Sequence, residues 1–255
     1  MKKNVLFFTS LKANDPALSS YQEWCFKTWT YYAKKYDCEI FILEEPLYDT
    51  QWMRPTWQRW FVHELLEANN IEYNQIALID IDTMVRWDTP NIFELSENRY
   101  TGVGDDISVE WNCNSITGYK KFFPNVDLRW DSYINNGMIV LPSDSKEFCK
   151  KITDFYLANA EELVQMQEHT LQKGTDQTPV NYMALEYYGD KIKYLPKRYN
   201  MTHLKTSLAL APCIETKLPV FIKYGYIWHF NAIHPRTDRD VLMSQTWEII
   251  KNNYE

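Results

Sequence analysis

The first eighty residues alternate between short apolar runs and amphipathic segments, and this alternation constrains the fold more than any other feature of the chain. The apolar runs at 4–10, 39–43 and 75–79 are typical of strands buried on both faces of a sheet. The segments at 21–36 and 55–69 have the apolar spacing of helices. Strands and helices in this order predict an α/β fold, with a mainly parallel central sheet flanked by helices and joined by right-handed crossovers.

Beyond residue 95 the pattern is less regular. We expect further strands near 100–103, 132–141 and 191–196 and within 224–236. We expect helices at 146–170, 176–188 and 239–253, and an irregular connection over 112–130. No repeat, low-complexity stretch or linker interrupts the sequence, so residues 1–255 are expected to form a single domain.

Two aspartates stand where the third of these strands ends. Asp80 and Asp82 directly follow the apolar run 76–79, and side chains two residues apart in an extended segment point the same way. Two such carboxylates repel each other unless a cation joins them, and their oxygen atoms suit Mg²⁺ or Mn²⁺. Ligands of parallel sheets bind beyond the carboxyl ends of the strands. The pair therefore indicates a divalent-metal site, although two turn aspartates would give the same pattern.

Composition narrows the classes of ligand. The net charge of −7 argues against a nucleic-acid partner, which would require a basic face, and means that an anionic ligand needs a local cation. Aromatic residues make up 16% of the chain, and their rings can either fill a core or line a cleft that stacks on sugars or bases. The tryptophans considered for such stacking are Trp52, Trp57, Trp60, Trp111 and Trp130.

Cysteine usage and the N-terminus bear on location. The five cysteines are odd in number, widely spaced and without a C-x-x-C pair, which predicts idle thiols in a reducing compartment. The N-terminal apolar run is too short for a signal peptide, and no stretch approaches the roughly 20 apolar residues of a membrane helix. We therefore expect a soluble, cytoplasmic protein. Asn200, Met201 and Thr202 form one glycosylation-type triplet, a pattern that is common by chance.

The stretch "IALIDIDTMVRWDTPNIFEL" resembles the D-x-D strand of glycosyltransferases with the GT-A fold, in particular family 8 and more distantly the galactosyltransferase/mannosyltransferase type. Three more segments follow in the family's order: "INNGMIVL", "GTDQTPVN" and "WHFNAIHPR". The resemblance runs from about residue 5 to about residue 236. It implies a Rossmann-like nucleotide-diphospho-sugar transferase, with a nucleotide-binding half over about 1–100 and a sugar- and acceptor-binding half over about 101–255.

The resemblance also implies a metal site. Asp80 would contact the ribose of the donor or the metal, Asp82 would bind the metal, and His229 would be the third ligand. The alternatives for His229 are a core histidine or a surface loop residue, but the His-Phe pair after an aromatic strand favours a ligand. The implied ion is Mn²⁺ or Mg²⁺, and the implied donor is a nucleotide-diphosphate sugar, UDP-linked rather than GDP-linked.

The last segment departs from the family. Ala232 stands about where a glycine that helps hold the pyrophosphate is expected, and His234 stands in place of a lysine. Arg236 is the candidate replacement cation, since its planar fork suits phosphate. The donor contacts implied here are therefore His234 and Arg236.

Residues beside the transferred sugar come from two other segments. Asn135, Asn136 and Gly137 would lie next to it, where amides hydrogen-bond hydroxyl groups without adding charge. Asp176 and Gln177 would face its reacting side, so that Asp176, Gln177 and Asn135 are the candidate catalytic residues. The alternatives are a strand bulge at Asn135 and a helix N-cap at Asp176.

The remaining candidates lie nearer the N-terminus. Arg59 resembles a helix arginine that reaches the donor, although it reads equally as a solvated helix residue. Thr9 and Ser10, at the end of the first strand, are placed to meet the base or ribose. Asp105 and Asp106 follow another strand and either meet a sugar or form a plain turn.

These features predict a metal-dependent glycosyltransferase (a hexosyltransferase) that moves a sugar to a hydroxyl of a glycan or other acceptor. The resemblance to family 8 implies that the configuration is retained. Two other classes stay open. A nucleotidyltransferase also uses paired carboxylates, but "FFTSLKAND" has no glycine for a phosphate loop. A non-catalytic nucleotide-sugar-binding module of the same fold would not need the metal residues. The oligomeric state is not predicted.

Overall fold

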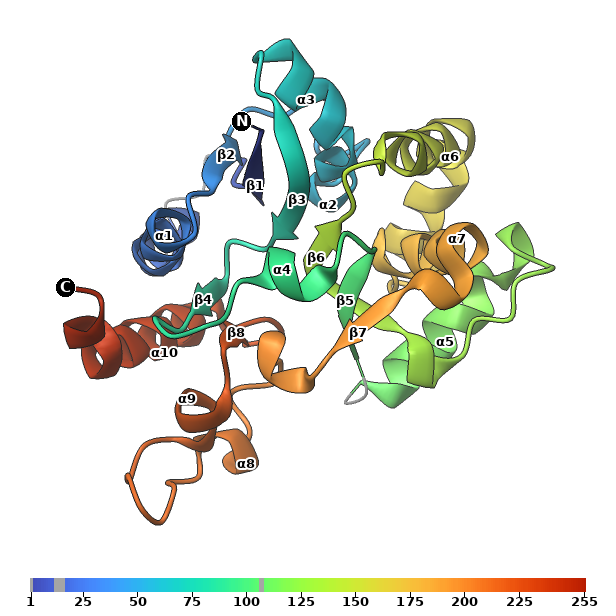
Figure 1. Cartoon of the computed structure of the whole chain (residues 1–255). Coiled ribbons are helices and arrows are strands. Elements are labelled where there is room, and N and C mark those ends of the chain that lie inside the picture. The colour runs from blue at the N-terminus through green and yellow to red at the C-terminus, as the bar shows by residue number, and fades with distance from the viewer. Residues whose placement is uncertain (1, 12–16, 106–107) are drawn as a thin grey trace.

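A computed structural model of the protein describes residues 2–11, 17–105 and 108–255, and it is built around one six-stranded sheet. The strands are β1 (Lys3–Thr9), β2 (Glu39–Leu43), β3 (Tyr73–Ile79), β5 (Thr101–Gly104), β6 (Ile134–Leu141) and β7 (Lys193–Leu195). Their order across the sheet is β2-β1-β3-β6-β5-β7. All pair in parallel except β6, which is antiparallel to both of its neighbours (Figure 1). The predicted mainly parallel sheet is confirmed.

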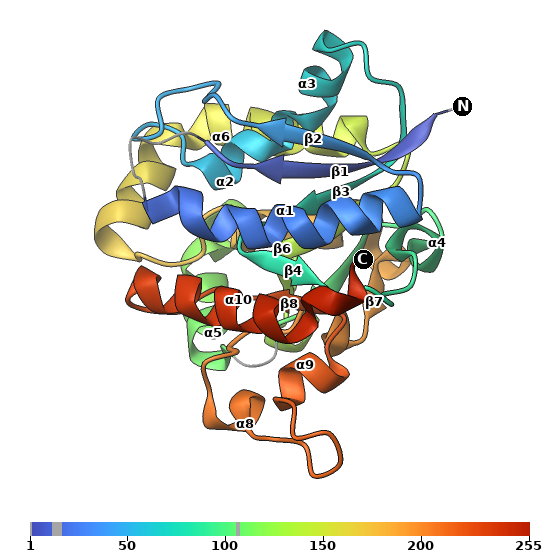
Figure 2. The ribbon, with the colours of Figure 1, turned by 90° about the vertical axis from the view of Figure 1, so that its left-hand side faces the viewer.

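Helices cover both faces of this sheet. The helices of the described residues, not all of which contact this sheet, are α1 (Ala17–Lys35), α2 (Pro55–Gln58), α3 (Val62–Ala68), α4 (Ile92–Ser96), α5 (Val109–Tyr119), α6 (Lys146–Gln165), α7 (Gln177–Tyr188), α8 (Ser207–Leu210), α9 (Val220–Tyr224) and α10 (Arg236–Ile250). A small second sheet joins β4 (Thr83–Val85) to β8 (Ile227–His229). Figure 2 shows α1 and α10 side by side along one face, with the β4–β8 pair behind them.

Successive side chains of β1 point to opposite faces of the sheet, which explains why the protein has two hydrophobic cores. Val5 and Phe7 point into a core shared with α2, α3, α6 and α7, whereas Leu6 and Phe8 point into a core shared with α1, β4, β8 and α10. All four side chains are almost fully buried. A strand with apolar residues at every position is therefore what a sheet covered on both faces requires.

Two predicted elements differ from the structure. The connection expected to be irregular at 112–130 begins within helix α5, whose buried positions include Asn112 and Ser115. A polar buried face removes the apolar periodicity that would have indicated a helix. The helix expected at 55–69 is instead α2 and α3 with a 3₁₀ turn at Arg59–Phe61 between them.

Two simpler expectations are also tested. All five cysteines lie among the described residues and are unpaired there, and Cys25, Cys149 and Cys213 are buried. Burial raises the pKa of Cys25 and Cys149 well above the ordinary thiol value, so neither is a reactive thiolate. Within the described residues, the helices are too short or too polar to cross a bilayer.

Candidate metal centre and adjoining cavities

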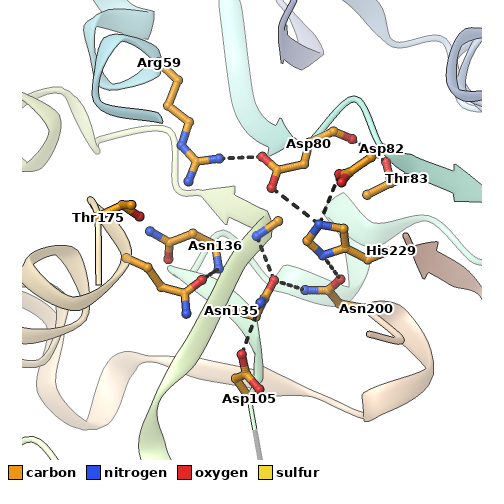
Figure 3. Close-up of polar contacts among 12 residues, drawn as sticks. Arg59, Asp80, Asp82, Thr83, Asp105, Asn135, Asn136, Thr175, Asn200 and His229 are labelled. Atoms are coloured by element: carbon orange, nitrogen blue, oxygen red, sulfur yellow. Dashed lines mark hydrogen bonds and ion pairs between the residues drawn. The ribbon is translucent and has the colours of Figure 1, made fainter. Parts of the chain in front are cut away.

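The turn that follows β3 is held by backbone and side-chain hydrogen bonds. The amide of Asp80 donates to the carbonyl of Gly137 on the neighbouring strand (3.0 Å). The hydroxyl of Thr83 donates to the carbonyl of Asp80 (2.7 Å) and accepts from the indole N–H of Trp29 (2.9 Å). The two aspartates therefore leave the sheet in a fixed conformation, with both side chains on the same side of the turn (Figure 3).

His229 reaches this turn from the far end of the chain. It ends β8, where it lies opposite Thr83 in the antiparallel β4–β8 pair. The next residue, Phe230, donates its amide to the carbonyl of Asp82 (2.8 Å). The two-stranded sheet thus serves to bring the imidazole against the aspartates, and the His229 side chain is only 3% exposed.

Each aspartate divides its two oxygens between an arginine and this imidazole. Asp80 accepts from Arg59 on Oδ1 (2.8 Å), and its Oδ2 lies 3.5 Å from Nε2 of His229. Asp82 pairs with Arg239 through Oδ2 (3.0 Å), and its Oδ1 lies 3.2 Å from the same nitrogen. One oxygen of each carboxylate therefore faces a common point beside Nε2 (Figure 3).

The other ring nitrogen of His229 also faces an acceptor. Nδ1 lies 3.2 Å from the amide oxygen of Asn200, and Asn200 in turn donates to Oδ1 of Asn135 (2.9 Å). The same Asn135 oxygen accepts the amide of Gly137 (3.0 Å). A proton on Nδ1 that is donated to Asn200 leaves the Nε2 lone pair directed at the aspartates, which is the tautomer that a metal ligand needs. Asn200 is fully buried, so its glycosylation-type triplet is no accessible modification site.

These three side chains fit a divalent ion. Asp80, Asp82 and His229 each offer one ligand atom, and these atoms lie within 4.8 Å of one another. Ligands about 2.1 Å from a six-coordinate ion lie about 3 Å apart when they are adjacent, close to the 3.2 and 3.5 Å separations of this site. Carboxylate oxygens suit hard ions such as Mg²⁺ and Mn²⁺, and imidazole suits borderline divalent ions, so the mixed ligand set indicates a divalent ion without identifying it.

The protein groups alone shift the pKa values of the triad. Burial lowers the pKa of His229, but Asp82 and Asp80 outweigh it, so this pKa lies above the ordinary value. Burial raises the pKa of Asp82, but His229 and Arg239 outweigh it, so this pKa lies below the usual range. At Asp80, burial outweighs the attraction of Arg59 and His229 and raises the pKa, although a side chain that is 37% exposed limits the rise. An imidazole whose two nitrogens both face acceptor atoms must either carry a second proton or bind a cation through Nε2.

Arg59 joins the metal ligands to a second buried carboxylate. Its guanidinium donates to Asp80 and, through Nη2, to Oδ2 of Asp176 (2.8 Å). The same Asp176 oxygen accepts from Trp60 Nε1 and from Asn136 Nδ2, both at 3.1 Å. Burial lowers the pKa of Arg59, but Asp176 and Asp80 outweigh it and raise the pKa above the ordinary value. Asp176 occupies the N-cap position of α7 but makes no capping hydrogen bond, so the N-cap alternative is wrong for its side chain.

The larger of two cavities beside the triad has a volume of about 580 Å³, a size typical of small-molecule sites. Its wall includes Asn135 and Gln177, and Gln177 accepts the amide of Asn136 (3.0 Å). The full lining is Asp105, Ser108, Val109, Glu110, Trp111, Asn135, Thr175, Gln177, His203, Asn231 and Ala232. Two of the predicted catalytic residues thus share one cavity, whereas Asp176 lies behind its wall.

The smaller cavity, of about 160 Å³, lies on the other side of the aspartates. It is lined by Thr9, Pro55, Thr56, Arg59, Asp80, Ile81, Asp82 and Arg239. The hydroxyl of Thr9 is buried and has no hydrogen-bond partner among the described residues. Ser10 is buried next to it, and its amide donates to the carbonyl of Leu43 (2.9 Å).

Known structures share this arrangement of elements. No protein-family model matches the sequence, and a search of curated proteins finds no match. The chain is similar to a glycosyltransferase involved in glycosylation of the major capsid of PBCV-1 (TM-score 0.54, 15% identity, 95% of this chain and 99% of that one). It is also similar to the galactosyltransferase LgtC in complex with donor and acceptor sugar analogs (TM-score 0.50, 10% identity, 97% and 96%). The chain has the GT-A glycosyltransferase fold.

A third structure with the GT-A fold is larger than this chain. The bifunctional glycosyltransferase WbbM matches 99% of this chain with a TM-score of 0.52 and 15% identity, and the chain spans 51% of its length. These likenesses confirm the predicted fold. The roles of individual residues remain predictions that depend on the geometry described above.

The segment after β8, where this chain departs from the GT-A sequence pattern, is only partly drawn into the site. Ala232 lines the larger cavity and has φ +53°, a left-handed conformation that favours glycine. His234 is exposed, and its carbonyl accepts from Lys205 (3.2 Å). Arg236 begins α10, but its side chain lies outside the described part of the structure. The donor contacts predicted for His234 and Arg236 stay predictions.

Two residues of the site were not predicted. Arg239, in the first turns of α10, pairs with Asp82 and lines the smaller cavity. Asn200 contacts both His229 and Asn135. An arginine in a helix that reads as a surface helix gives no signal of its own, and Asn200 attracted notice only as part of a glycosylation-type triplet. Asp105, considered as either a sugar contact or a turn, lies buried in the larger cavity.

Proposed function

We propose that this chain is a metal-dependent glycosyltransferase. It moves a sugar from a nucleotide-diphosphate sugar, UDP-linked rather than GDP-linked, to a hydroxyl of a glycan or other acceptor. The observation that carries the proposal is the triad: Asp80, Asp82 and His229 each direct one ligand atom at a common point, and both nitrogens of the imidazole face acceptors. The GT-A fold supports the same conclusion.

The triad would hold Mn²⁺ or Mg²⁺, which when bound supplies positive charge to the diphosphate that leaves with the bonding electrons. Arg59 and Arg239 orient the two aspartates by occupying the oxygens that do not face His229. Both arginines also line the smaller cavity, so they add positive charge where the diphosphate of the donor would lie. Thr9, in the same cavity, has a free hydroxyl group for the ribose or base.

The larger cavity would hold the transferred sugar and the acceptor. In the reaction, the bond from the anomeric carbon to the diphosphate breaks, a bond to the acceptor oxygen forms on the same face, and the proton of the acceptor hydroxyl passes to the leaving diphosphate. Asn135 and Gln177 stand at the wall between this cavity and the triad, where their amides can bind hydroxyl groups. Asp176 keeps Arg59 and Asn136 in position, and we propose that it acts on the donor sugar from there.

The different linings of the two cavities support a nucleotide-binding half over about 1–100 and a sugar- and acceptor-binding half over about 101–255. The smaller cavity draws its lining from the first half together with Arg239, and the larger cavity draws its lining from the second half. The single domain would therefore bind the two ends of the donor with two different sets of elements.

The test is release of nucleotide from a panel of UDP- and GDP-sugars with Mn²⁺, Mg²⁺ or EDTA. We expect release from one donor, abolished by EDTA and by Asp82→Asn. The matched control is Asp88→Asn, an exposed aspartate paired with Arg86, which should behave as the unmodified protein. Release of pyrophosphate from a nucleoside triphosphate and a sugar phosphate would instead identify a nucleotidyltransferase. Binding of a donor without turnover would identify a binding module.

A further inference from the structure

Two side chains that line the larger cavity carry buried oxygens without a hydrogen-bond donor among the described residues. Asp105 is 4% exposed; its Oδ2 accepts from Asn135 (3.2 Å), while its Oδ1 is buried without a partner among the described residues. The side-chain oxygen of Asn231, in the same wall, is also buried and has no partner in the part of the chain that the structure describes. An unsatisfied buried carboxylate oxygen is costly, so a ligand that brings hydroxyl donors to these atoms gains affinity from them.

The carboxylates of the larger cavity have no lysine or arginine beside them in its lining. The described lining includes the carboxylates of Asp105 and Glu110, and the imidazole of His203 in the same wall contacts the hydroxyl of Ser108 (2.9 Å). The nearby lysines are already engaged: Lys173 lies 3.5 Å from Glu110, and Lys197 donates to the carbonyl of Gly104 (3.2 Å). A carboxylate or phosphate placed beside Asp105 would therefore meet like charge, with no lysine or arginine in the described lining to pair with it.

One aromatic ring completes the cavity. Of the five tryptophans considered for stacking, Trp111 lines it, whereas Trp57 and Trp60 are buried in the core. Trp111 packs edge-to-face against the buried Tyr133, with ring centroids 6.4 Å apart, which fixes its orientation. A fixed indole offers an apolar surface to the C–H face of a sugar ring.

We propose that this cavity selects an uncharged sugar as the acceptor, with hydroxyl groups donated to Asp105 and Asn231 and the ring against Trp111. Acceptors that carry a carboxylate or phosphate next to the reacting hydroxyl are rejected, and Asp105 is the residue that determines this specificity. The inference rests on the proposed glycosyltransferase function, because it names the acceptor class of that same site.

The test compares matched sugars that differ only in charge. Methyl glucoside is paired with methyl glucuronide, and methyl galactoside with methyl galacturonide. Binding is measured by ligand-observed NMR with Mn²⁺ replaced by Mg²⁺ and with UDP present, and transfer is measured separately with the donor identified above. We expect at least one neutral member to bind about tenfold more tightly than its acid. Equal binding within both pairs, or no binding of either neutral sugar, would overturn the inference.

Variants assign the effect to named side chains. Asp105→Asn keeps the shape but removes the charge and adds an N–H donor, so the ratio of neutral to acidic binding should fall at least about threefold. Asp154→Asn, an exposed aspartate paired with Lys150, is the control and should leave the ratio unchanged. Trp111→Ala should weaken both members of a pair equally, and Trp130→Ala, at a 44% exposed position outside this lining, should not.

Two further readouts separate the possible failures. The melting temperature of each variant shows whether it folds, and an unchanged ratio in a folded Asp105→Asn would overturn the role of Asp105. Metal-dependent hydrolysis of the donor without any acceptor reports on the proposed function alone. If hydrolysis persists while the paired sugars bind equally, the function stands and the acceptor inference fails. If hydrolysis is absent while the neutral sugars bind selectively, the proposed transfer fails and the selectivity of the cavity stands.

Discussion

Gly137 and His229 are in contact so close that a side chain at the glycine would occupy the space of the imidazole. An ideal Cβ on Gly137 would lie 2.1 Å from Cε1 and 2.4 Å from Nδ1 of the ring. The amide of Gly137 donates to Oδ1 of Asn135, and the carbonyl of Gly137 accepts from the amide of Asp80. Strand β6 therefore supplies the floor on which the third metal ligand rests.

Gly137→Ala should weaken metal binding without unfolding the sheet. The added methyl group displaces the His229 ring from the aspartates, and displacing a ligand through its surroundings typically costs about 10- to 100-fold in metal affinity. Calorimetric titration with Mn²⁺ measures this. Gly104→Ala is the control, since the nearest atom to its Cβ would be the carbonyl oxygen of Tyr133 at 3.8 Å. Equal affinity in the two variants would contradict the contact described here.

Arg59→Met should destabilise the fold by about 3 to 5 kcal/mol, because it leaves the buried carboxylate of Asp176 without its charged partner. Unfolding in urea measures the change. The control is Arg54→Met, which removes a half-exposed ion pair with Glu168 and should cost less than about 1 kcal/mol. If the two substitutions cost the same, the Arg59–Asp176 pair is not a structural element.

Because His63 is buried, the free energy of unfolding should be lower in mild acid than at neutral pH. Its ring is fully buried between the Tyr73 hydroxyl (2.8 Å) and the Ser145 hydroxyl (3.0 Å), and burial lowers its pKa from 6.5 to about 4. Between these values the unfolded chain holds the extra proton, so stability falls as the pH drops from 6.5 toward 4, by roughly 3 kcal/mol in all.

Urea unfolding at pH 7.5 and at pH 4.5 checks this prediction. His63→Gln removes the titrating ring, so it should lower stability at pH 7.5 while flattening the decline between the two values. His169→Gln removes an exposed imidazole and serves as the control, with the decline expected to persist. An equal decline in the unmodified protein and in His63→Gln would show that other groups cause it.

Ala232→Gly should stabilise the protein by about 0.5 to 1 kcal/mol. The left-handed conformation at φ +53° costs an alanine roughly 1 kcal/mol or more, and glycine adopts it freely, although glycine also loosens the unfolded chain. Ala211→Gly is the control. The φ of −56° at Ala211 already suits an alanine, so glycine relieves no strain there and should lower the stability by about 0.5 to 1 kcal/mol. Thermal unfolding distinguishes the two directions, and a loss at both positions would contradict the strain at Ala232.

The sequence predicted the frame of the molecule better than its site. Continuous apolar runs before Thr9 and Asp80 were enough to predict parallel strands, since such runs fit only a sheet covered on both faces. The direction of β6 was not predictable, because periodicity carries no information on strand polarity. Helix α5 was missed because its buried positions at Asn112 and Ser115 are polar.

The residues of the site also differ in whether a local sequence pattern could reveal them. Asp80 and Asp82 were found from charge placed at a strand end, which is a local pattern. His229 and Arg59 were found through resemblance to a family, and the structure does bring both to the aspartates. Arg239 depends on where α10 lies relative to β3, a long-range relationship to which no neighbouring residue in the sequence gives a clue.

The position of β8 in the chain determines the order in which the metal ligands are synthesised. The last strand of the large sheet ends at Leu195, whereas His229 follows only after α8 and α9. During synthesis, the two aspartates and all six strands of the large sheet therefore precede their histidine, and the layer that α10 completes is made last. A single proteolytic cut in the segment between β7 and β8 would break the covalent link between the aspartates and the histidine without cutting any strand of the large sheet.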